Sequence, residues 1–332
     1  MYSLLKDIAL TQGVTGKEKA VAEKIKGLIA PYCDESYIDA MGNLICLKKG
    51  SDKAAKKIML CAHMDEIGFI VNFIEKSGAI RIATVGGISF AACAYGEVVS
   101  ENGTRGVLVP NSGTKPEDYK ADVFYIDIGA DSDSQAKKKV KIGDVFNLKS
   151  NVTRLCGQRV AGRPLDDRIG CAVVVDIAKQ IASVGSKHDV YYVFSVQEEV
   201  GCRGSKTAAF AIQPDVALAF DVTGTGDTAG AKPMQVKLGG GAAIKIKDAS
   251  VICDVDVVER LQEIAKEKKI KAQLEILQYG GTDTSSMQMS GAGCAAGALS
   301  IPSRYIHSGV EMIDMKDAEA CADLAVEFIK SY

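Results

Sequence analysis

The hydrophobic positions along the chain follow two different periods. In residues 1–30 apolar side chains recur at three- and four-residue spacings, interrupted by glycines, which predicts two amphipathic helices. Further on, short uninterrupted apolar runs with polar flanks are typical of buried parallel strands. Four such runs are IMLCAH at 58–63, VYYVFSV at 190–196, VALAF at 216–220 and AGCAAGALS at 292–300. Helical patterns follow at 168–181, 255–268 and 316–329. We therefore expect an α/β fold, a mixed sheet flanked by helices on both faces.

The segment 69–158 has a different pattern. Short alternating runs are separated by turn residues, and Asn102-Gly103 predicts a hairpin between two of them. The segment has no long helical pattern. We predict that it forms a small β-barrel or sandwich inserted into the α/β domain, which then consists of residues 1–68 and 159–332.

Composition narrows the class of protein further. The chain has 332 residues, 47% of them hydrophobic and 25% charged, which is enough for about two globular domains. Its 40 basic and 42 acidic side chains nearly cancel, so we expect neither nucleic acid nor a membrane as partner. No apolar stretch approaches the roughly 20 residues of a membrane span, and the N-terminus lacks the pattern of a secretory signal. Ten cysteines without a C-x-x-C pair suggest reduced thiols and a cytoplasmic location.

Polar side chains gather where the predicted strands end. His63 ends the first strand, Glu198 and Glu199 follow the second, and Asp221 follows the third. The carboxyl ends of parallel strands meet at one edge of a sheet, where ligands and catalytic groups collect. Asp166 and Asp167 stand just before a helix, and the last strand leads to His307, the second histidine of this group.

Imidazoles and carboxylates on one edge suit a borderline divalent metal such as Zn²⁺ or Co²⁺, and this many carboxylates suits two ions. Each residue alone has a simpler interpretation. A histidine in an apolar run is more often packed in the core, and an aspartate before a helix is more often a cap. The convergence of several such groups favours the metal site. His188 lies at a turn before a strand, and we expect it to be an ordinary loop histidine.

Six short motifs carry a family resemblance. They are HMDE at 63, PLDDR at 164, QEEVG at 197, FDVT at 220, GGTDT at 280 and RYIHS at 304. In this order and spacing they resemble the cocatalytic dimetal aminopeptidases of the tetrahedral (TET) type, which include glutamyl aminopeptidases and proteins labelled FrvX or cellulase M. The resemblance extends over essentially the whole chain, including the inserted β domain. It implies a zinc-peptidase-like catalytic domain.

The resemblance implies a role for each matching position. The residues that match the metal ligands are His63, Asp166, Glu199, Asp221 and His307. Asp166 would bridge the two ions, whereas its neighbour Asp167 is not expected to be a ligand. Asp65 would accept a hydrogen bond from His63 and fix its tautomer, and Glu198 would be the general base. The residues expected to border the substrate are Gly280, Gly281, Thr282 and Asp283, with Arg304 as one candidate cation for an acidic N-terminal residue.

The reaction that these roles imply is removal of the N-terminal residue from short peptides. Two cations about 3.5 Å apart would lower the pKa of a bridging water, whose proton Glu198 would take and return to the leaving amine. The free α-amine of the substrate would bind one ion. The resemblance also implies a homo-oligomer, in which dimers formed through the β insertion assemble into a hollow dodecamer that admits short peptides.

Three other functions fit part of the pattern. A glycoside hydrolase could use Glu198 and Glu199 as paired carboxylates, but it would leave His63 and His307 without a role and would be indifferent to chelators. A deacylase or carboxypeptidase could use the same two metals. A non-catalytic assembly protein could keep the metals for stability, but it would not need Glu198.

Overall fold

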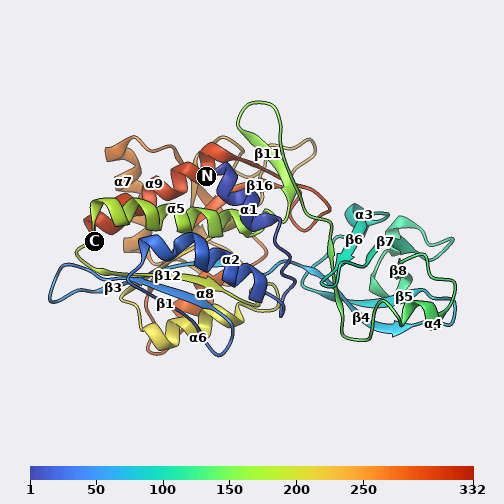
Figure 1. Ribbon diagram of the computed structural model, residues 1–332. Coiled ribbons are helices and arrows are strands. Elements are labelled where there is room, and N and C mark those ends of the chain that lie inside the picture. The colour runs from blue at the N-terminus through green and yellow to red at the C-terminus, as the bar shows by residue number, and fades with distance from the viewer.

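The computed structural model describes residues 1–332 and has two parts, a large α/β part and a six-stranded barrel beside it. Both chain termini lie on the α/β part (Figure 1). The barrel projects from the end of this part at which the first barrel strand, in cyan, leaves the sheet.

Four neighbouring parallel strands form the centre of the large sheet. In spatial order they are β12 (Asp189–Ser195), β3 (Lys57–His63), β13 (Val216–Thr223) and β16 (Ala295–Arg304). They correspond to the four apolar runs, and their side chains are almost all buried because helices cover both faces of the sheet. The predicted α/β fold with a mixed sheet is confirmed. Strand β13 extends three residues beyond the apolar run, so Asp221 lies inside the strand.

Seven further strands complete the eleven-stranded sheet. One edge has β1 (Glu35–Ile38) and β2 (Leu44–Lys48), and the other has β17 (Glu311–Asp314), β11 (Arg159–Arg163) and β10 (Asn151–Arg154). Strand β14 (Ala242–Lys247) pairs antiparallel with β16 and parallel with β15 (Ala272–Ile276). Parallel pairs at the centre and at β14–β15, with antiparallel pairs elsewhere, make this a mixed sheet.

The helices form a layer on each face of the sheet (Figure 1). The thicker layer contains α1 (Tyr2–Ala9), α2 (Lys19–Ile29), α5 (Arg168–Val184), α7 (Val255–Lys268) and α9 (Met315–Ser331), with the short turn η1 (Ala30–Tyr32) after α2. It encloses the main core of 55 buried residues, which explains why α5 is buried along most of its length. On the opposite face α6 (Arg203–Ile212) and α8 (Asp283–Gln288) cover a smaller core.

The barrel is closed and antiparallel, in the order β4-β5-β8-β7-β6-β9. Its strands are β4 (Gly68–Ile74), β5 (Ile80–Val85), β6 (Glu97–Ser100), β7 (Arg105–Pro110), β8 (Phe124–Asp127) and β9 (Val145–Leu148). Its only helices are the short α3 (Phe90–Cys93), α4 (Asp133–Ala136), η2 (Pro116–Asp118) and η3 (Ala121–Val123). The expected hairpin joins β6 to β7, with Gly103 at a φ of +83° that favours glycine.

The borders of the insertion stay a prediction. The barrel strands span residues 68–148, whereas β10, from Asn151, pairs with the large sheet. The sequence predicts an insertion from 69 to 158. This range includes β10, because its short alternating sequence has the same pattern as a barrel strand.

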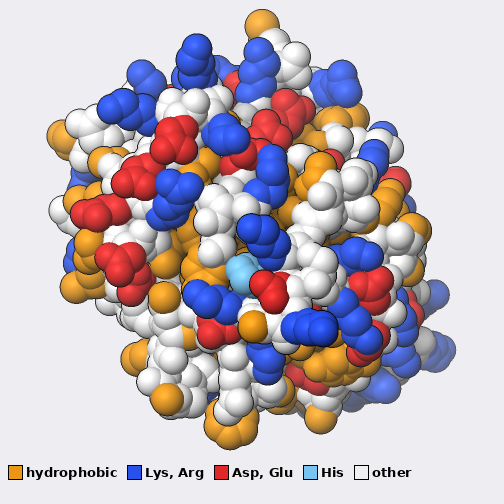
Figure 2. All heavy atoms as spheres, turned by 90° about the vertical axis from the view of Figure 1, so that its left-hand side faces the viewer, with side chains coloured by type: hydrophobic (Ala, Val, Ile, Leu, Met, Phe, Trp, Pro, Cys, Tyr) orange, Lys and Arg blue, Asp and Glu red, His pale blue; other side chains and the backbone are white.

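The surface has the mixed charge that the composition predicts. On the face of the α/β part that points away from the barrel, basic and acidic side chains are interspersed (Figure 2). None of the helices combines the length and the apolar composition needed to cross a membrane.

Candidate active site

Strand ends and one helix start bring the predicted site residues together. His63 ends β3 and pairs in register with Ser195, the last residue of β12, after which the chain reaches Glu198 and Glu199. Asp221 comes from β13 next to them. Asp166 precedes α5, and His307 follows β16. All five predicted ligands and Glu198 line one cavity of about 610 Å³.

Two groups of metal-binding side chains share Asp166. The first group is His63, Asp166 and Asp221, and the second is Asp166, Glu199 and His307; within each, the ligand atoms lie within 4.8 Å of one another. Asp166 Oδ1 is 3.1 Å from His63 Nε2, and Asp166 Oδ2 is 3.3 Å from His307 Nε2. The carboxylate of Asp166 thus has one oxygen toward each group.

The site strongly favours positive charge. Burial alone would lower the pKa of His307, but Asp166 and Glu199 raise it to about 11. Burial likewise opposes charge on His63, yet Asp166, Asp221 and Asp65 raise its pKa well above the ordinary value. Burial raises the pKa of Asp221 to about 6, although His63 opposes this shift. A pocket of converging carboxylates that stabilises cationic imidazoles would also stabilise metal cations.

Asp65 contacts His63 and the backbone of the two glutamates. Its carboxylate is fully buried and lies 3.4 Å from His63 Nδ1. One oxygen accepts the backbone N–H of Glu198 at 3.0 Å, and the other accepts that of Glu199 at 3.2 Å and the hydroxyl of Thr15 at 2.8 Å. Burial would raise the pKa of Asp65, but these hydrogen bonds and His63 lower it. Asp65 therefore orients an imidazole and the backbone that carries two carboxylates.

Glu198 lies in the cavity but outside the two groups that share Asp166. With Cys202 and Asp283 it forms a third cluster of possible ligand side chains. Its Oε1 accepts a hydrogen bond from Cys202 Sγ at 3.1 Å. Burial raises the pKa of Glu198 well above its ordinary value, and Asp221 and Asp283 add to the shift. Burial also raises the pKa of the Cys202 thiol, so the thiol keeps its proton and acts as donor. The carboxylate of Glu198 is thus placed to exchange a proton.

The predicted substrate residues separate into two groups. Gly280 and Gly281 line the cavity. Thr282 instead caps the N-terminus of α8, and Asp283 is buried beneath the cavity, where it accepts hydrogen bonds from Ser195 and Ser205. Arg304 does not line the cavity, because its guanidinium forms an ion pair with Asp227 at 2.7 Å.

Several residues near the site carry no signal in the sequence. Lys206, from α6, is the one lysine that lines the cavity. Glu311, from β17, accepts the backbone N–H of Asp166 at 3.0 Å and that of His307 at 3.3 Å. Thr15 and Glu18, from the N-terminal segment, lie outside the cavity and form hydrogen bonds with Asp65 and with the backbone N–H of Gln197. Their positions depend on contacts between distant segments, which periodicity and motifs do not report.

The donor set fits two divalent ions. Each of the two groups offers one imidazole nitrogen and carboxylate oxygens, the ligands that Zn²⁺ and related ions accept in proteins. The shared carboxylate suits a pair of ions at short separation.

Solved structures with the same fold define the class of protein. An aminopeptidase from the archaeon Desulfurococcus kamchatkensis matches 100% of this chain and 94% of its own, with a TM-score of 0.95 and 36% identity. The TET1 peptidase of Pyrococcus horikoshii, which can assemble into a tetrahedron or a large octahedral shell, matches 99% of both chains, with a TM-score of 0.87 and 31% identity. The chain therefore has the fold of the TET aminopeptidases.

The sequence comparisons identify the family. Residues 42–324 match the M42 glutamyl aminopeptidase model. The lysyl aminopeptidase of Pyrococcus furiosus is 34% identical, over 98% of this chain and 95% of its own length. The chain belongs to the M42 family and is an aminopeptidase, which confirms the family that the six motifs indicated. Peptidases of this family depend on metal, in keeping with the two metal-binding groups.

Proposed function

We propose that this aminopeptidase removes N-terminal residues from short peptides by metal-assisted hydrolysis, with Glu198 as the general base. The observation that carries the proposal is the shared position of Asp166 between two metal-binding groups, with Glu198 beside both. The arrangement uses both histidines of the site, which a glycoside hydrolase with paired carboxylates would leave without a role.

Two divalent ions, Zn²⁺ or Co²⁺, would occupy the two groups. His63 and Asp221 would hold one ion, Glu199 and His307 the other, and Asp166 would bind both. When bound, such ions lower the pKa of a water between them, polarise the scissile carbonyl and hold the free α-amine of the substrate. Asp65 would keep His63 in the tautomer whose Nε2 is free for the metal.

Glu198 would move the proton. Its carboxylate takes a proton from the attacking water as the C–O bond forms, and gives that proton to the amine as the C–N bond breaks. The products are a free amino acid and a peptide shortened by one residue. Burial raises the pKa of Glu198, and a carboxyl that holds its proton more tightly can keep that proton until the amine leaves.

The substrate would enter through the cavity described above. Its walls combine glycines at 280 and 281 with Ser250, Leu277 and Met289, which leaves room for a side chain next to the two metal-binding groups. Gly280 and Gly281 are the two predicted substrate residues that we keep in this role.

We also propose that the chain acts as a cytoplasmic homo-oligomer, built from dimers into a dodecamer through the barrel. A solved TET1 dodecamer and the tetrahedral shell of the Pyrococcus horikoshii relative support this. The mass of the metal-loaded protein in sedimentation experiments tests it: a particle of one chain, 35.1 kDa, would contradict the proposal.

The role of Glu198 can be tested with Glu198→Gln. This variant keeps the shape of the side chain but cannot take a proton, so turnover should fall by about 10²- to 10⁴-fold. Bound metal, measured by atomic emission, should stay at two ions per chain because Glu198 is outside the two groups that share Asp166. Glu267→Gln, on the exposed surface of α7, is the control and should leave both values unchanged. Near-normal turnover in Glu198→Gln would rule out the assigned role.

A further inference from the structure

The turn that carries Glu198 and Glu199 starts from a disfavoured backbone conformation. Gln197 has a φ of +58°, in the left-handed region that residues with a side chain rarely adopt. Such a conformation persists only where the surrounding structure holds it. We call residues 197–199 the catalytic turn, because its geometry decides where the two carboxylates point.

Each backbone N–H of the catalytic turn donates to a carboxylate. Those of Glu198 and Glu199 donate to Asp65, as described above. The N–H of Gln197, the strained residue, donates to Glu18 Oε1 at 3.2 Å. Glu18 thus completes the set of acceptors that holds the turn, from a position 179 residues away in the sequence.

Glu18 is buried without a cation. Its relative exposure is 6%, and no lysine, arginine or histidine lies within ion-pair distance of its carboxylate. Its hydrogen-bond donors are the backbone N–H groups of Gly16, at 2.7 Å, and of Gln197. Burying a carboxylate without a cation costs free energy, and the pKa of Glu18 is raised by this burial and by Asp65. The stability of the fold therefore does not explain why the carboxylate of Glu18 is buried without a cation.

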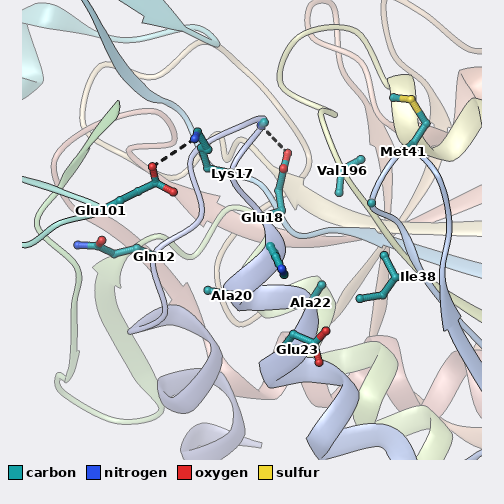
Figure 3. Close-up of a pocket in the computed structure, with 13 residues that line it drawn as sticks. Gln12, Lys17, Glu18, Ala20, Ala22, Glu23, Ile38, Met41, Glu101 and Val196 are labelled. Carbon is teal, nitrogen blue, oxygen red and sulfur yellow. Dashed lines mark hydrogen bonds and ion pairs between the residues drawn. The ribbon is translucent and has the colours of Figure 1, made fainter. Parts of the chain in front are cut away.

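Glu18 cannot contact the substrate directly. It stands at the start of α2 and lines a second cavity of about 750 Å³, together with Glu23, Ile38, Met41 and Val196 (Figure 3). This cavity shares no lining residue with the active-site cavity. The hydrogen bond to the backbone of Gln197 is therefore the direct contact between Glu18 and the catalytic turn.

We infer that Glu18 is a positioning residue for the reaction: by accepting the N–H of Gln197 it fixes the catalytic turn, which directs Glu198 toward the attacking water and Glu199 toward its metal. The inference rests on the roles proposed above for Glu198 and Glu199. Thr15, three residues before Glu18, donates to Asp65, so one N-terminal segment supports both carboxylates that hold the turn.

The test compares three variants of the full-length, metal-loaded enzyme. Glu18→Ala removes the acceptor, and a misplaced catalytic group should lower kcat by about 10- to 100-fold with KM within about twofold. Glu18→Gln keeps an oxygen that can accept the same N–H, and should restore most of kcat. Glu23→Ala is the matched control: Glu23 lies on the same helix and lines the same cavity, but it is exposed and should leave kcat unchanged.

A second readout does not depend on activity. Hydrogen–deuterium exchange of the Gln197 amide should be faster in Glu18→Ala than in the wild type and in Glu23→Ala, because its acceptor is gone. This readout stands even if Glu198→Gln is active and the role of Glu198 is wrong. The inference is overturned if exchange and kcat are unchanged in Glu18→Ala, if Glu18→Gln is as impaired as Glu18→Ala, or if kcat falls only in proportion to lost metal.

Discussion

Asp166 and Asp167 are adjacent in the sequence but have opposite surroundings. Asp166 faces two imidazoles, which lower its pKa although burial opposes the shift. Asp167 caps α5 by accepting the N–H of Gly170 at 2.9 Å, and burial raises its pKa well above the ordinary value. The environment of Asp166 favours a permanent anion, as a metal ligand requires, whereas that of Asp167 does not.

Asp317, which belongs to none of the metal-binding groups, offers a test of how burial acts on a single carboxylate. It stands in the first turn of α9 and accepts the N–H groups of Gly239 and Gly241, both at 2.7 Å. Burial raises its pKa to about 6 despite these bonds. The unfolded value is about 3.9, so the folded state holds the proton more tightly, and the free energy of unfolding should fall as the pH rises from about 4 to 6.

Asp317→Asn makes this pH dependence measurable. The melting temperature of the wild type minus that of Asp317→Asn should decrease between pH 4 and pH 6.5 and then stay constant, because the asparagine does not titrate. Asp256→Asn, at an exposed position in α7, is the control. The melting temperature of the wild type minus that of Asp256→Asn should not decrease between pH 4 and pH 6.5. A difference that grows with pH for Asp317→Asn would contradict the account.

At the scale of elements, the predictable features are those with a local pattern. The central strands β3, β12, β13 and β16 are apolar along their length because both faces are covered, so their positions follow from the sequence. The polar residues at their ends then predict the edge where the candidate site lies. The hairpin at Asn102-Gly103 follows from its turn residues.

Other positions depend on contacts between distant segments. Asp283 belongs to a motif that the resemblance places at the substrate, but it is buried under the cavity. There the hydroxyls of Ser195 and Ser205 donate hydrogen bonds to its carboxylate. Arg304 is held away by Asp227. Glu18 contacts Gln197, which is 179 residues away in the sequence. No local pattern carries this information, since each contact joins elements that only the complete fold brings together.

The barrel presents apolar side chains to solvent, which suits its proposed role in assembly. Phe73, on β4, is 58% exposed. Because the barrel is closed, it has no free strand edge, and partners would have to associate through side chains. Phe73→Glu should therefore weaken association by about tenfold or more, as loss of a buried aromatic anchor does at other interfaces.

Sedimentation velocity over a range of concentrations measures this effect. Phe210→Glu is the matched control: Phe210 is 65% exposed, but it lies on α6 of the α/β part. Assembly that is unchanged in Phe73→Glu and lost in Phe210→Glu would place the interface on the α/β part instead of on the barrel.

At the scale of the whole molecule, the barrel also borders the active site. Ser89, in the segment after β5, donates its backbone N–H to the carbonyl oxygen of His307 at 3.2 Å, and Gly87 lines the cavity. Lys17 of the α/β part pairs with Glu101 of the barrel at 3.4 Å. The barrel segment at Gly87 thus forms part of the cavity wall, while Lys17 and Glu101 join the two parts at the second cavity.

The central claim is that this protein is a metal-dependent enzyme that requires a free N-terminus. The most direct test is release of p-nitroaniline from a panel of aminoacyl p-nitroanilides, free and N-acetylated, before and after EDTA and with Zn²⁺ or Co²⁺ restored. We predict cleavage of the free substrates alone, its loss with EDTA and its return with metal, because the α-amine would bind at the metal centre. Cleavage that persists in EDTA, or that includes acetylated substrates equally, would contradict the account.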